Sequence, residues 1–119
     1  MNDAHRLLAL TALAAGLHST LGWEWTAAAG LAAGYWMPQR AWIYGGVVVG
    51  LDYALFVAFS FARDPRAVGV MTETMGAFLG NMPSYAVVAL TVVLGVAIGI
   101  VTGAAGRRLR HLVDRPLGR

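Results

Sequence analysis

The chain of 119 residues has no cysteine and no lysine, and only 13% of its residues are charged. The absence of cysteine excludes a small secreted domain held together by disulfides. Charged residues make up about 25% of an average soluble domain. A domain this small has much surface for its volume, and half the usual charge cannot cover that surface. The low charge therefore excludes an ordinary soluble protein.

Apolar residues are what the sequence has in abundance: 58% are hydrophobic, and the mean hydropathy is +0.62. This excess excludes a disordered chain and predicts an all-α integral membrane protein. We expect residues 1–119 to form one membrane domain, a small polytopic helical bundle. It would contain about four transmembrane helices plus a short interfacial or re-entrant helix. The helices are expected at residues 4–21, 22–37, 41–62 and 83–106.

The number of membrane spans depends on the region before Pro38. Residues 4–21 and 22–37 form either a tight helical hairpin or one long tilted helix. The hairpin is favoured, because a single helix would place Glu24 and its flanking tryptophans in the middle of a span, where they are costly. Only the two later segments reach the roughly 20 residues of a usual span. Three and four spans therefore both stay open.

All nine positive charges are arginines, and six of them are Arg6 and five in segment 107–119. Because positive residues gather on the cytoplasmic side of membrane proteins, we expect a cytoplasmic C-terminus in a bacterial or archaeal cytoplasmic membrane. The predicted basic tail, 107–119, would meet the anionic leaflet, with Arg107, Arg108 and Arg110 at lipid headgroups. A basic end on an apolar chain indicates topology, so no nucleic-acid partner is expected.

Residues 67–82 are neither a good span nor an ordinary loop. Apolar side chains recur there at helical spacing, among them Met71, Met75 and Phe78, with Glu73 between them. This pattern predicts an amphipathic helix at the outer membrane face. Methionines at this spacing are more typical of packing or lipid contact than of a soft-metal site, so no metal site is predicted.

Glycines recur at four-residue spacing in the later segments. Without a hydrophobic driving force in lipid, helices associate by close backbone approach, which glycine permits. These faces could pack within the chain or against another chain, so a homo-oligomer or other membrane subunits are expected as partners beside the lipid bilayer. The helix-packing glycines are Gly30, Gly34, Gly46, Gly50, Gly95, Gly99 and Gly103.

Asp52 lies near the middle of the predicted helix 41–62. A carboxylate at the centre of a span costs at least about 2.5 kcal/mol, so it should face protein or water. It could be a proton or cation site or a polar contact to a substrate. It could equally make a structural hydrogen bond to another helix. The candidates for the polar centre and its helpers are Asp52, Tyr44, Tyr53, His18, Glu24 and Glu73.

The function expected from these features is transport. We find no convincing catalytic constellation or phosphate-binding loop, so an enzyme is not expected and no cofactor is indicated. The sequence favours a transporter or channel-like component centred on Asp52, acting as an oligomer or as the membrane subunit of a larger system. A small-molecule substrate is compatible with this hypothesis. The alternative is a non-catalytic accessory subunit that packs against larger membrane proteins through its glycine faces.

Overall fold

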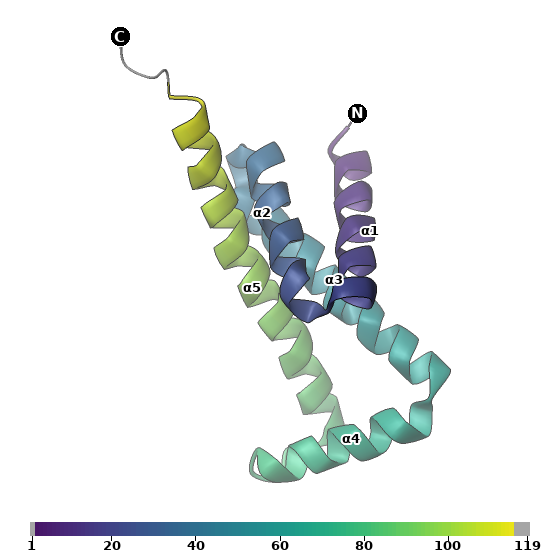
Figure 1. The fold of residues 1–119 in the computed structure, drawn as a ribbon. Helices are drawn as coiled ribbons and strands as arrows, with labels where there is room; N and C mark the ends of the chain where they lie inside the picture. The colour runs from purple at the N-terminus through teal and green to yellow at the C-terminus, as the bar shows by residue number, and fades with distance from the viewer. Residues whose placement is uncertain (1, 116–119) are drawn as a thin grey trace.

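The computed structural model describes residues 2–115, and this part of the chain is all-helical and has no strands (Figure 1). The predicted all-α class is confirmed. Met1 and residues 116–119, the end of the predicted tail, lie outside the described residues. The elements are α1 (Asp3–Leu21), η1 (Trp23–Trp25), α2 (Thr26–Trp36), η2 (Pro38–Arg40), α3 (Ala41–Arg63), α4 (Pro65–Phe78) and α5 (Ser84–Val113).

Local sequence explains where the first two helices begin and end. The side chain of Asn2 caps α1 by accepting a hydrogen bond from the backbone N–H of His5 (3.0 Å). Helix α1 ends at Gly22, whose φ of +104° is strained for any residue with a side chain. The chain turns there into α2, which stops just before Pro38 because proline cannot continue a helix. The first two helices therefore form a hairpin.

Two segments are long and apolar enough to cross a membrane, which supports membrane association. They are Pro38–Arg63, with a mean hydropathy of 1.7, and Ser84–Val113, with 2.5. The prediction of about four spans is not supported. Helix α2 is too short, with 11 residues or about 16 Å at 1.5 Å per residue between Gly22 and Pro38. Helix α1 has 19 residues, but it is not apolar enough to count as a span.

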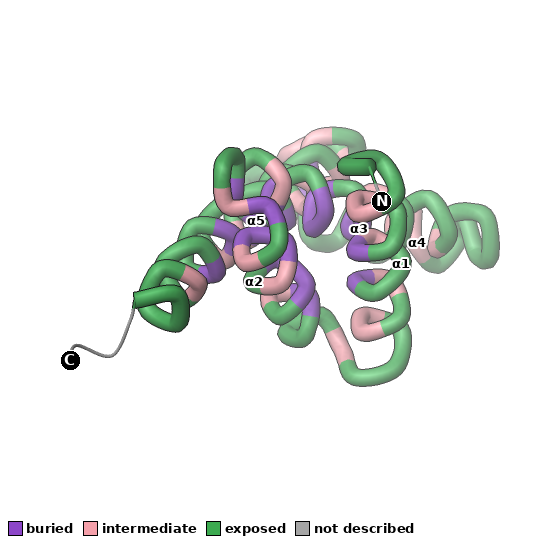
Figure 2. Tube along the Cα trace, turned by 90° about the horizontal axis from the view of Figure 1, so that it is seen from above, coloured by how far each residue is buried: buried purple, intermediate pink, exposed green. Residues whose placement is uncertain are grey.

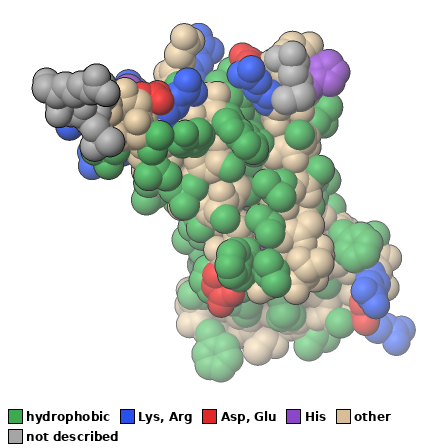
Figure 3. Space-filling view, turned by 45° about the horizontal axis from the view of Figure 1, so that its top comes forward, with side chains coloured by type: hydrophobic (Ala, Val, Ile, Leu, Met, Phe, Trp, Pro, Cys, Tyr) green, Lys and Arg blue, Asp and Glu red, His purple; other side chains and the backbone are tan. Residues whose placement is uncertain are grey.

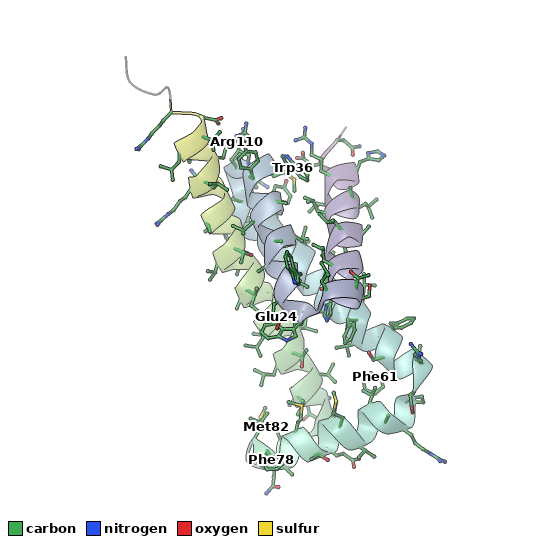
Figure 4. The ribbon with its side chains drawn as sticks, in the orientation of Figure 1. Glu24, Trp36, Phe61, Phe78, Met82 and Arg110 are labelled. Atoms are coloured by element: carbon green, nitrogen blue, oxygen red, sulfur yellow. The ribbon has the colours of Figure 1, made fainter. Side chains whose placement is uncertain are left out.

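The hairpin extends only about half-way along the molecule. His18, near the end of α1, contacts Asp52, which lies eleven residues from either end of α3. In Figure 4, Glu24 at the tip of the hairpin lies about half-way along the bundle, whereas Phe78 and Met82 lie at one end of it. Among the described residues, α4 packs only on α3 and α5. We call the part of the molecule that contains α1, α2 and the segments of α3 and α5 packed against them the arginine half, after Arg6, Arg40 and Arg110 at its end. The remainder, which contains α4 and the ends of α3 and α5 that α4 joins, is called the α4 half.

The arginine half is packed on glycine. Gly34 of α2 meets the backbone of Gly103 of α5, and Gly45 of α3 meets that of Gly99. A Cβ atom added at Gly34 or Gly99 would overlap those backbone atoms. Seen from above, the buried parts of α2, α3 and α5 face one another (Figure 2). The glycines therefore hold these three helices at backbone contact within one chain.

The α4 half is open by comparison. Helices α3 and α5 diverge towards it, and α4 joins their ends (Figure 1). Pro65 occupies the first turn of α4, and the Asp64 side chain accepts a hydrogen bond from the N–H of Ala67 (3.0 Å). Large apolar side chains are exposed here, including Phe59 at 62% and Phe78 at 87%. On the face shown in Figure 3, hydrophobic side chains cover the length between arginines at the two ends.

Candidate functional site

A buried ion-pair geometry joins α1 to the centre of α3. The Nδ1 atom of His18 lies 2.8 Å from Oδ2 of Asp52, and the two side chains are 9% and 2% exposed. When Asp52 is ionised, its carboxylate only accepts hydrogen bonds, and the imidazole then donates through Nδ1. The contact places the two side chains close enough to share one hydrogen bond.

Aromatic side chains fix the orientation of the His18 ring. Phe56, one helical turn after Asp52, stacks on the imidazole with ring centroids 4.2 Å apart and an interplanar angle of 13°. The Tyr53 ring is tilted by 54° to the imidazole, with the ring centroids 5.4 Å apart. Tyr53 itself is buried and fits against Gly95 of α5, where a Cβ would collide with its ring. The site therefore involves α1, α3 and α5.

A cavity of about 380 Å³ adjoins the pair. Asp52 contributes to its wall together with Ser19 of α1 and the apolar side chains Leu55, Phe56 and Phe59 of α3. Among residues 2–115, His18 provides the only recorded hydrogen bond to the carboxylate. The carboxylate is thus buried from bulk solvent and yet borders a space that a small molecule could enter.

The other sequence candidates are not brought to Asp52. Tyr44 lies two turns earlier on α3, and its hydroxyl donates to Oδ2 of Asp3 (3.4 Å). Glu24 is exposed at the tip of the hairpin, and Glu73 is exposed on α4. In the described part of the chain, no group of three potential ligands could hold a metal ion.

The predicted headgroup arginines differ from one another in the structure. Arg107 and Arg108 are exposed on the last turns of α5. Arg110 is half-buried: one terminal N–H donates to the Tyr35 carbonyl (3.0 Å), and Nε donates to Asp114 (3.2 Å). Its guanidinium also lies over the Tyr35 ring, 6.0 Å from the centroid.

Sequence reasoning missed two features of the site. Phe56 was not singled out, although it follows Asp52 by four residues and therefore shares its helix face. The convergence of Arg6, Arg40 and Arg110 at one cavity was also missed, because it depends on how the hairpin folds back.

The comparisons with known proteins give no match. No protein-family model fits this sequence, and no curated protein or solved structure is significantly similar to it. The function must therefore be inferred from the geometry of the chain itself.

Proposed function

We propose that the protein is a small integral membrane protein that acts as a transporter or channel-like component, and that the His18–Asp52 pair carries a proton during transport. The observation that carries this proposal is the pair itself, buried at the midpoint of a helix long enough to cross a bilayer. Ionisable groups at this depth are costly and typically belong to ion or proton pathways.

The chemistry of the pair suits a single exchangeable proton. When His18 donates through Nδ1, the pair has a net charge of −1 with Nε2 bare and of zero with Nε2 protonated. Binding one proton thus neutralises a buried site, and releasing it restores a charge there. Electrostatic interactions are stronger in a low-dielectric environment than in water, so the two protonation states would differ in how they interact with their surroundings.

The proposed topology follows from the hairpin. Helices α3 and α5 cross the bilayer, while α1 and α2 enter from the cytoplasmic side and turn back at the depth of Asp52. Non-helical backbone at membrane depth is tolerated where it is buried in protein or lines a cavity. The uncovered lengths of α3 and α5 would then contact lipid, further copies of the chain or other subunits.

The test is proton flux through the purified protein in liposomes, driven by a potassium diffusion potential and followed with an entrapped pH-sensitive dye. Asp52→Asn should reduce the flux to that of protein-free liposomes, because asparagine can still accept from His18 but cannot hold the charge. Asp64→Asn is the matched control, since asparagine caps a helix as well as aspartate does. Flux that is equal in wild type and Asp52→Asn, or absent from wild type, contradicts the proposal.

The second candidate is an accessory subunit that binds larger proteins through glycine faces. The structure lends it less support, because Gly34, Gly99 and Gly103 are already in contact with helices of the same chain. Under this alternative, Asp52→Asn would leave flux unchanged, and the protein would co-purify with a larger complex from mild detergent.

A further inference from the structure

Three arginines that are far apart in the sequence line one cavity at the end of the arginine half. The cavity holds about 580 Å³, and its wall includes Arg6 of α1, Arg40 before α3 and Arg110 of α5. Asp3 is the only acidic residue among its lining residues. Within residues 2–115, the structure records no ion pair for Arg6 or Arg40. The cavity is therefore lined by an excess of positive charge.

Arg110 is held in place by two hydrogen bonds, and its remaining N–H groups are free to bind a ligand. Its bonds to the Tyr35 carbonyl and to Asp114 use two of the five N–H donors of a guanidinium. The remaining three N–H groups can donate to another acceptor. A side chain fixed in this way loses little conformational freedom when an anion binds.

A second cavity, of about 440 Å³, shares Arg6, Trp36 and Arg110 with the first. Its other lining residues are Ala9 and Leu10, which lie along the inner part of α1. Figure 4 places Trp36 and Arg110 at the same end of the bundle. The two cavities together combine a cationic mouth with an apolar wall that continues between α1 and α2.

We propose that these cavities bind one anionic phospholipid, with its phosphate at Arg6, Arg40 and Arg110 and the beginning of an acyl chain along Ala9, Leu10 and Trp36. Guanidinium groups bind phosphate oxygens through paired, charge-assisted hydrogen bonds. Tryptophan is enriched where membrane and water meet. The apolar wall favours a lipid over a free phosphate compound, since the latter would leave that wall unused.

The experiment measures binding of short-chain phosphatidylglycerol to the purified protein in a neutral detergent, with phosphatidylcholine and inorganic phosphate as comparison ligands. Wild type should prefer phosphatidylglycerol over both. The double variant Arg6→Gln/Arg40→Gln should weaken its binding by about fivefold per arginine. Neither arginine has a recorded ion pair, so we expect the fold to persist, and helical circular dichroism checks this.

The matched control is Arg63→Gln/Arg66→Gln, which removes the same charge from the exposed arginines at the end of α3 and the start of α4. This control should leave phosphatidylglycerol binding unchanged. Equal losses in the two double variants would show diffuse surface attraction and overturn the site. Inorganic phosphate binding as tightly as phosphatidylglycerol would overturn the lipid assignment, because the apolar wall would then contribute nothing.

Discussion

The arginine half and the α4 half of this chain are held together by different kinds of contact. In the arginine half, Gly34, Gly45, Gly99 and Gly103 bring three helices to backbone contact. In the α4 half, three helices enclose an apolar cavity of about 120 Å³ and leave Phe59 and Phe78 exposed. This difference shows that the positions of the helices in the arginine half are determined by close packing within the chain. Both halves expose large apolar side chains, among them Leu8 and Val101 in the arginine half, but within residues 2–115 only the arginine half is held by contacts between glycine backbones.

The largest effect should come from breaking the glycine contacts. Gly99→Leu would push a side chain into the backbone of Gly45, which cannot move aside as a flexible side chain could. We expect a loss above roughly 4 kcal/mol, beyond the usual range for overpacking. Thermal unfolding in detergent, followed by circular dichroism, measures it.

The matched control lies in the α4 half. A Cβ at Gly69 would meet nothing within 4 Å, and leucine is a better helix former than glycine. Gly69→Leu should therefore leave the unfolding midpoint unchanged or slightly raised. If Gly69→Leu were as damaging as Gly99→Leu, the contrast between the two halves would be wrong.

The next largest effect on stability should come from breaking the His18–Asp52 pair, which lies near the turn of the hairpin. Either His18→Phe or Asp52→Leu alone leaves a buried polar group without its partner, at a cost of about 2 kcal/mol. The double variant removes both groups and should recover most of that loss. A double-mutant cycle on unfolding free energies tests this. Strictly additive losses would mean that the pair does not link α1 to α3.

The smallest effect is expected on the outer surface of α4. Phe78→Ser removes a side chain that is 87% exposed, so the unfolding free energy should change by less than about 0.5 kcal/mol. A large loss of stability in detergent would show that Phe78 packs inside the molecule.

The helical class and several helix boundaries could be predicted from the sequence, because each of them depends on residues close together in the chain. The low charge and high apolar content predicted helices, and Pro38 marked the boundary after the second of them. The depth of the hairpin was not accessible. It depends on which residue of α3 pairs with His18, and helical periodicity sets faces without setting the register between helices. The expectation of about four spans came from counting both helices of the hairpin as spans, although α2 has only 11 residues.

Part of the candidate site could also be predicted from the sequence. Asp52 stood out because a lone carboxylate in an apolar helix is costly, and His18 was among its possible partners. Tyr44 was also named, but it lies eight residues before Asp52 on α3 and is hydrogen-bonded to Asp3 instead. The arginine cavity needs three distant segments to meet, and no local pattern encodes such a meeting.

The separation of His18 and Asp52 has a consequence for how the chain is made. The two residues are 34 positions apart, so the ribosome adds Asp52 about 2–7 s after His18 at usual synthesis rates. The glycines of α5 follow later still. During that interval the newly made hairpin has neither its polar partner nor the backbone surface on which it packs. The hairpin therefore reaches the contacts that it makes in the folded chain only after α3 and α5 have been made.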